Sequence, residues 1–372
     1  MSWQIKPENF GCPLPAADGA TVQLAHGGGS RLAAELIEQT LVPAFADPVL
    51  SRLEDQAVLE SPLGAGERLA FTTDSFVVDP LFFPGGSIGE LAINGTINDL
   101  AMGGARPLYL SVALIVEEGL ELAILRRVIA DLGAAAKAAG VRVVTGDTKV
   151  VGRGSCDKIF INTSGIGAVP AGLALSAANL QPGDKIIISG TMADHGMAIM
   201  SCRQGLSFAE PLTSDTAALH QLTAAIMAAA GMPPAAPAQK ANEPEAGQAL
   251  RAMRDPTRGG VAAVLTEMAR ASRVGVVIAE ETLPVAGPVR GACEILGIDP
   301  LFVANEGKLL AVVAPESAGA VLQAMREHPL GRQAAIIGEV VAENPGLVAL
   351  RTALGPHRII DLPSGELLPR IC

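Results

Sequence analysis

Apolar and polar positions along the first half of the chain predict short strands separated by helices. Strands are expected over residues 69–73, 108–116, 141–145 and 159–166, where apolar residues are continuous or alternate with polar ones. Helices are expected after Ser30, a natural N-cap, over 88–102, and over a stretch that begins at Leu122 and ends at Gly140. This order of elements is typical of a mixed α/β unit.

The alternation resumes in the second half, after a polar stretch at 169–183 that contains two prolines. Strands are expected over 185–189, 276–280, 309–313 and 335–341, with helices over 195–203, over 214–230 and after Gly260. We therefore expect two domains of the α/β (α+β) class.

The sequence pattern predicts four parts of the chain: an N-terminal extension over 1–23, a first domain over 24–168, a second domain over 169–360 and a tail over 361–372. A proline-rich stretch at 232–247 is expected to be a surface loop. Two prolines and a glycine in the tail disfavour a helix, so the tail is expected to be extended and mobile.

Composition narrows the class of protein. The 372 residues include 27 Lys plus Arg and 38 Asp plus Glu, a net charge of −11, which argues against a general binder of nucleic acid or anionic membranes. Mean hydropathy is high, +0.38, yet no run approaches the roughly 20 apolar residues of a spanning helix, and the N-terminus has no apolar signal-peptide core. The five cysteines have no zinc or disulfide spacing, so a cytoplasmic protein is expected.

Three aspartates are candidates for binding a metal and phosphates. Asp74 ends the first predicted strand, Asp99 follows Asn98 in the helix over 88–102, and Asp147 lies in the string GDTK at 146–149. Carboxylates that converge from separate elements are what Mg²⁺ requires, with phosphate oxygens completing its shell. The alternative is that each aspartate caps a turn. No Walker A string is present, so any phosphate site must follow another design.

Three further strings admit both a functional and a structural interpretation. The glycines of HGGGS at 26–30 could bind an anion before a helix or form a flexible turn, and RDPTRGG at 254–260 could supply cations or form a capped turn. Glu306, in NEGK, could be a proton-transfer base or a turn residue.

Cys372, at the end of the tail, is hard to explain by packing. It does not form a prenylation box, and nothing nearby in the sequence lowers the pKa of its thiol. Two interpretations remain from the residues alone: a sulfur on a mobile arm that carries a chemical group between sites, or chance placement.

Nine short strings, taken together, match a known family. They are LAHGGG (24–29), TTDSFVVDPLFFPGG (72–86), ND (98–99), VTGDTKVV (144–151), FINTSG (160–165), DHG (194–196), RDPTRGG (254–260), ANEGK (304–308) and PRIC (369–372). Over residues 24–372 the chain resembles the HypE family of carbamoyl dehydratases, which make the cyanide ligands of [NiFe]-hydrogenases. The looser strings are shared with the ATP-binding superfamily of aminoimidazole ribonucleotide (AIR) synthetase and selenophosphate synthetase.

The resemblance implies two domains like those of AIR synthetase, with ATP and Mg²⁺ in the cleft between them. It implies that a carbamoyl group on Cys372 is phosphorylated by ATP and dehydrated to a thiocyanate, with Glu306 and Lys149 as candidates for the proton transfer. Asp74, Asp99 and Asp147 are then expected to hold the metal. The residues expected to bind ATP and its phosphates are Gly27, Gly28, Gly29, Asn98, Asp147, Thr148 and Arg258.

The resemblance also implies partners. A carbamoyltransferase, HypF, would load Cys372, a HypC–HypD complex would receive the cyanide, and the first domains would form a homodimer. Two alternatives stay open: a selenophosphate synthetase-like enzyme, although Cys12 lacks the neighbouring lysine that such an enzyme needs, and a non-catalytic docking protein, which would leave Lys149 and the aspartates unexplained.

Overall fold

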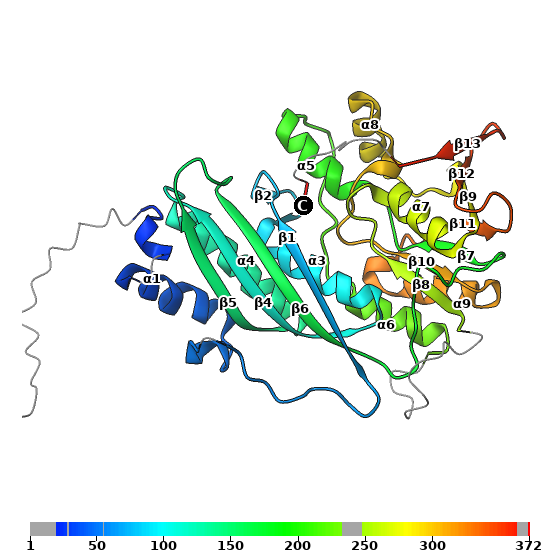
Figure 1. Cartoon of the computed structure of the whole chain (residues 1–372). Coiled ribbons are helices and arrows are strands. Elements are labelled where there is room, and N and C mark those ends of the chain that lie inside the picture. Colours follow the sequence, from blue (N-terminus) through cyan, green and yellow to red (C-terminus); the bar gives the residue numbers. More distant parts are fainter. Residues whose placement is uncertain (1–19, 28–29, 55, 233–247, 363–370) are drawn as a thin grey trace, which may run out of the picture.

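The computed structural model describes residues 20–27, 30–54, 56–232, 248–362 and 371–372. Two sheets, each with its own helices, lie side by side, and the C-terminus lies between them (Figure 1). The sequence-predicted loop at 232–247, apart from residue 232, and tail residues 363–370 lie outside the described residues, as do residues 1–19.

The first sheet has four strands in the order β1-β6-β4-β5. Their bounds are Arg68–Phe76 (β1), Arg106–Glu117 (β4), Arg142–Val151 (β5) and Ile159–Val169 (β6). β4 and β5 are parallel, and the other pairs are antiparallel. A small hairpin follows β1, formed by Phe82–Phe83 (β2) and Gly86–Ser87 (β3).

Two helices cover one face of this sheet. Ile88–Met102 (α3) has the predicted bounds; Ser87 caps its N-terminus, and nearly every residue is buried because the helix lies between the sheet and the second unit. Leu122–Ala139 (α4) buries only one stripe and ends at Gly140, which adopts the left-handed conformation expected of a C-terminal cap (φ 69°).

The opposite face of the first sheet carries exposed apolar side chains. Leu69 and Phe71 in β1 are 58% and 67% exposed, and Ile115 in β4 is 42% exposed. Such a patch on an ordered sheet is typical of an interaction surface. Short helices flank the β5 edge: Arg31–Leu36 (α1), which the side chain of Ser30 caps as predicted, a π-helical turn over Ile37–Leu41, and Val42–Phe45 (α2).

The second sheet has seven strands in the order β13-β12-β9-β11-β7-β10-β8. Their bounds are Lys185–Ile188 (β7), Leu250–Arg254 (β8), Gly275–Ala279 (β9), Leu310–Val313 (β10), Ala335–Val341 (β11), Val348–Arg351 (β12) and His357–Ile360 (β13). β7 and β10 are buried on both faces, which explains their continuous apolar sequences.

Helices lie on both faces of this sheet. Gly260–Ser272 (α7) packs on one face, and His220–Ala229 (α6) and Pro315–Glu327 (α9) pack on the other. Asp194–Gln204 (α5) and Gly287–Leu296 (α8) form a separate small core. Among the described residues, no helix is long and apolar enough to cross a membrane.

The structure corrects two sequence expectations. Strand β5 continues to Val151, so Asp147 and Lys149 lie inside a strand and not in a loop after it. The helix predicted over 214–230 begins at His220, because residues 214–219 form an irregular segment held by the first unit: the Ser214 N–H donates to the Pro84 carbonyl and the Leu219 N–H donates to the Asn98 side chain.

Candidate functional site

Three carboxylates face one another where the two units meet. Asp74 comes from β1, Asp99 from α3, and Asp255 from the loop after β8. Burial is the main cause that raises the pKa of each, and the charges of Asp99 and Asp74 help to raise the pKa of Asp255 to about 7. The Thr72 hydroxyl donates to Asp99 (2.9 Å) and fixes its orientation.

A cavity of about 480 Å³ opens beside these carboxylates. Asp99, Asp255 and Arg258 line it, and the Arg258 guanidinium lies 3.8 Å from Asp74. The sequence analysis singled out the string around Arg258 for its cations and missed Asp255, although Asp255 lies in that same string. In the described part of the chain, no three His, Cys, Asp or Glu side chains are close enough to hold a metal ion by themselves.

Cys372 lies near Glu306, Asp74 and Arg258. Its thiol lies beside the Glu306 carboxyl group, and its backbone carbonyl accepts the Val77 N–H (3.2 Å). Burial, with the Glu306 charge second, raises the pKa of the thiol well above its usual range. The preceding Ile371 is 2% exposed and belongs to the core of the first unit. Ile371 is therefore buried in the first unit, and Cys372 packs half-buried against the same core.

Glu306 has properties expected of a base. It is 2% exposed, and burial together with the charge of Asp255 raises its pKa well above the ordinary value. Its Oε1 atom is buried without a hydrogen-bond partner among the described residues. A buried acceptor without a donor is costly, so this oxygen is suited to receive an N–H from a bound group.

Two side chains hold the backbone of Glu306. The Asn98 amide donates to the Glu306 carbonyl (2.9 Å) and to the Ala217 carbonyl (3.0 Å), and its oxygen accepts the Leu219 N–H (2.8 Å). Asp215 accepts the Glu306 N–H (3.0 Å). Asn98 was expected at the ATP phosphates; in the structure its side chain hydrogen-bonds three backbone groups of the second unit and so links the two units.

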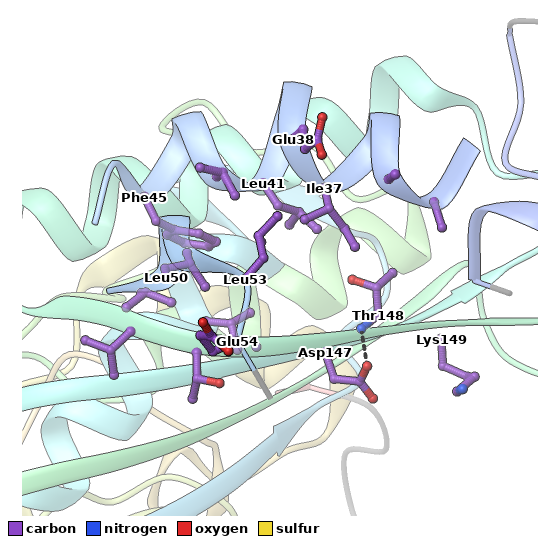
Figure 2. Close-up of a pocket in the computed structure, with 18 of the residues that line it drawn as sticks. Ile37, Glu38, Leu41, Phe45, Leu50, Leu53, Glu54, Asp147, Thr148 and Lys149 are labelled. Atoms are coloured by element: carbon purple, nitrogen blue, oxygen red, sulfur yellow. Dashed lines mark hydrogen bonds between the residues drawn. The ribbon is translucent and has the colours of Figure 1, made fainter. Parts of the chain in front are cut away.

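The other predicted residues line a separate pocket of about 480 Å³, between β5 and the short N-terminal helices (Figure 2). Gly27, Asp147, Thr148 and Lys149 lie at one end of it, and apolar residues such as Phe45 line the rest. A Cβ on Gly27 would lie 2.4 Å from the backbone nitrogen of Val150, so only glycine allows this close approach. Gly28 and Gly29 lie outside the described residues.

Within one chain, the two sets of residues are apart. Strands β6 and β4 separate β1 from β5. Asp147 pairs with Ala113, which pairs with Asn162, which in turn pairs with Ser75, so these four residues lie on one face of the sheet. Asp74, next to Ser75 in β1, points to the opposite face, toward α3. The structure therefore brings together Asp74, Asp99, Arg258, Glu306 and Cys372. It does not bring Asp147 to the other two aspartates, nor Lys149 to Cys372.

Comparisons with known proteins agree with this architecture. Residues 53–169 match the family model of the AIR synthase related protein, N-terminal domain, and residues 181–349 match that of its C-terminal domain. Carbamoyl dehydratase HypE of Bradyrhizobium diazoefficiens is 52% identical over 94% of this chain and 96% of its own length.

Two solved structures are also similar over most of the chain. A crystal structure of hydrogenase maturation protein HypE in complex with ATP has a TM-score of 0.85 and 45% identity, and it covers 95% of this chain and 100% of its own. The HypE chain of a HypE–HypF complex has a TM-score of 0.73 and 46% identity, and it covers 88% and 99%. The chain therefore belongs to the HypE family of carbamoyl dehydratases, enzymes of hydrogenase maturation within the AIR synthase-related superfamily.

Proposed function

We propose that this chain dehydrates a carbamoyl group carried on the thiol of Cys372 and thereby makes a thiocyanate, the precursor of a cyanide ligand for hydrogenase iron. One observation carries this assignment. The Glu306 carboxyl group lies beside the thiol, and its buried Oε1 has no donor among the described residues. A carbamoyl group on the thiol would place its NH₂ beside this free acceptor.

The reaction proceeds in two steps. In the first, the carbamoyl oxygen attacks the γ-phosphorus of ATP, an O–P bond forms as ADP leaves, and nitrogen loses one proton. In the second, the C–O bond breaks with release of phosphate, and the second N–H proton is removed as the C≡N bond forms. Glu306 is the base next to that nitrogen, and its raised pKa makes it a stronger proton acceptor than an ordinary carboxylate. The balance is one ATP consumed, with ADP, phosphate and a protein thiocyanate formed.

Asp74, Asp99 and Asp255 are assigned to Mg²⁺ and the ATP phosphates. Burial, and after it the negative charges of Asp99 and Asp74, raise the pKa of Asp255, and a bound divalent cation would offset the repulsion among the three carboxylates. Because no three such side chains within the described ranges are close enough to hold the ion alone, phosphate oxygens are proposed as further ligands, as is usual for magnesium. When bound, the ion neutralises charge on the phosphates. Arg258 lies beside Asp74 and is placed to contact the transferred phosphoryl group.

The pocket beside β5 is assigned to the other part of the nucleotide site, in a homodimer. The exposed face of the first sheet would pair with the same face of a second copy. A two-fold axis parallel to the strands would bring the β5 edge of one copy next to the β1 edge of the other, because these strands are the two edges of the sheet. Gly27, Asp147 and Lys149 of one copy would then complete the site at Asp74 of the other.

The partners follow from family membership. A similar HypE chain has been solved as a complex with HypF, so we propose a HypF-type carbamoyltransferase as the source of the carbamoyl group. A HypC–HypD complex is proposed as the acceptor of the cyanide. We place the reaction in the cytoplasm, because it needs a reduced thiol, and the described cysteines are free.

The test is the intact mass of the protein incubated with carbamoyl phosphate, Mg²⁺-ATP and a HypF partner. The expected result is gain of one carbamoyl group on the peptide that contains Cys372, followed by loss of one water. ATP hydrolysis without any adduct on Cys372 would contradict the proposal and favour a different enzyme of the superfamily.

A further inference from the structure

His195, near the start of α5, is a buried histidine that the proposed chemistry does not use. It is 0% exposed, and the ring of Phe83 packs edge-on against it at 5.5 Å between centroids. Its Nε2 lies 2.9 Å from the Ile371 carbonyl oxygen, and its Nδ1 lies 2.7 Å from the Ser214 hydroxyl. Both ring nitrogens are therefore occupied, one of them by the residue that precedes Cys372.

The hydrogen bonds fix the orientation of the ring. A carbonyl oxygen can only accept, so Nε2 carries the proton and donates to Ile371. Nδ1 must then accept from the Ser214 hydroxyl, whose oxygen in turn accepts the Thr216 N–H (3.1 Å). Burial lowers the pKa of His195, which keeps the ring neutral with this single proton.

We propose that His195 is a positioning residue that holds the Cys372 thiol against Glu306, with Ser214 fixing the tautomer that this requires. The end of the chain is held from both units: His195 of the second unit binds the Ile371 carbonyl, and Val77 of the first binds the Cys372 carbonyl. The inference deepens the proposed function, because it assigns the contact that keeps the carrier residue at the base.

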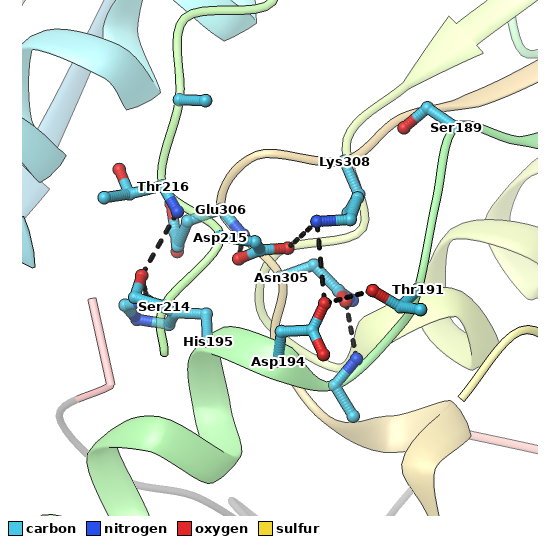
Figure 3. A network of polar contacts seen from close by, with 12 residues as sticks. Ser189, Thr191, Asp194, His195, Ser214, Asp215, Thr216, Asn305, Glu306 and Lys308 are labelled. Atoms are coloured by element: carbon cyan, nitrogen blue, oxygen red, sulfur yellow. Dashed lines mark hydrogen bonds and ion pairs between the residues drawn. The ribbon is translucent and has the colours of Figure 1, made fainter. Parts of the chain in front are cut away.

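The same segment also supports the base. Ser214 orients His195, and the next residue, Asp215, accepts the Glu306 N–H (3.0 Å) while it pairs with Lys308 (3.0 Å) (Figure 3). Asp215 is 4% exposed, so this contact is shielded from water. Adjacent residues thus position the thiol and the carboxylate, and a shift of this segment would disturb both.

The test measures how fast iodoacetamide alkylates Cys372 in the full chain without nucleotide or carbamoyl group. Only the released thiol can react, so the rate follows the small fraction of molecules in which Cys372 has left Glu306. Replacing His195→Ala removes one hydrogen bond that favours the docked state, and we expect alkylation to accelerate by about tenfold. The pH profile should also shift to lower pH, because the released thiol loses the burial that raises its pKa.

Two further variants guard against a general folding defect. Ser214→Ala keeps the ring and removes only its orienting partner, so it should accelerate alkylation by a smaller factor with an unchanged melting temperature. His220→Ala, at the start of α6, removes a histidine whose Nδ1 has no partner among the described residues, and it should leave the rate unchanged. Wild-type alkylation rates in both His195→Ala and Ser214→Ala would overturn the inference; if His195→Ala does not fold, Ser214→Ala alone decides.

This readout is independent of the proposed reaction. If the wild-type protein forms no thiocyanate, the alkylation rates still report whether His195 holds Cys372. If dehydration occurs, His195→Ala should accept the carbamoyl group at least as fast as the wild type, because its thiol is released more often, and should dehydrate it more slowly.

Discussion

The thiol of Cys372 lies beside the carboxyl group of Glu306, and burial raises the pKa of both groups. A thiol in this position stays protonated at neutral pH and is a poor nucleophile. It is therefore unsuited to attack an activated carbamoyl donor while it is docked. Loading of Cys372 and dehydration of its carbamoyl group must take place in different positions of this residue.

Replacing Glu306→Gln should stop dehydration while leaving the earlier steps intact. The amide keeps the shape of the side chain but cannot accept a proton, so we expect the dehydration rate to fall about 10²- to 10⁴-fold. Mass spectrometry should show the carbamoyl adduct accumulating on Cys372. The exposed Glu343 is the matched control, and Glu343→Gln should behave as the wild type. Wild-type dehydration by Glu306→Gln would mean that another group is the base.

Dehydration of preloaded enzyme should accelerate as pH rises. The base must be ionised, and burial raises the pKa of Glu306 well above the ordinary 4.5, so the rising limb moves toward neutral pH. The negative charges of Asp255, Asp215 and Asp74 also raise the pKa of Glu306. The positive charge of Arg258 lowers it. Single-turnover rates at a series of pH values test this. A profile that is flat from about pH 5 upward would contradict it.

Replacing Asp255→Asn should weaken binding of Mg²⁺-ATP. The variant removes one of three carboxylates assigned to the ion, and we expect a loss of about 10- to 100-fold in affinity by calorimetry. Glu267→Gln is the control, because Glu267 lines the same cavity but pairs with Arg254 (3.1 Å). Equal affinities for the two variants would remove Asp255 from the metal site.

Replacing Gly307→Ala should impair both folding and dehydration. A Cβ there would lie 1.7 Å from the Asp215 carbonyl oxygen, so Asp215 and the neighbouring Glu306 must separate. Overpacking of this kind costs about 1–3 kcal/mol in the free energy of unfolding. Gly291 in α8 has nothing within 4 Å of its would-be Cβ, and Gly291→Ala should instead stabilise by about 0.5–1 kcal/mol. Thermal melts and single-turnover rates of the two variants provide the comparison.

Mixed dimers test whether two copies share each site. Asp99→Asn and Lys149→Met should each be inactive alone. In a mixed dimer, one of the two sites combines an intact Asp99 from one copy with an intact Lys149 from the other, so refolding the two together should restore about a quarter of wild-type activity.

Mixing Asp99→Asn with Asp74→Asn should restore none, because both changes lie in the same half of the site. Recovery in neither mixture would place each site within one copy. Phe71→Glu puts a charge on the exposed sheet face and should halve the mass measured by sedimentation.

The elements with a strong periodic pattern were predictable. The bounds of α3 agree because apolar residues run between a Ser cap and glycines, and α4 ends at Gly140 as expected. The start of α6 was not predictable, because hydrogen bonds with the first unit hold residues 214–219 in an irregular conformation before the helix. The local sequence does not show which residues of the other unit will contact this segment.

The candidate site divides in the same way. The family strings PRIC and ANEGK singled out Cys372 and Glu306, because each string has a distinctive local composition. The structure places these two side chains next to each other, and their catalytic roles stay predictions. Asp255 was not predicted as a metal ligand, because the two arginines of the same string, Arg254 and Arg258, led to its interpretation as a source of cations. The separation of Asp147 from Asp74 depends on strand order, which spacing along the chain does not reveal.

Asn98 has a consequence for how the molecule melts. One buried amide satisfies two carbonyls and one N–H that belong to the second unit. Unfolding either unit alone would leave these groups without partners, at a cost of about 1–3 kcal/mol for each one that remains buried. The two domains should therefore unfold in a single cooperative transition. The Asn98 side chain, which helps to orient Glu306, thus also couples the stability of one domain to that of the other.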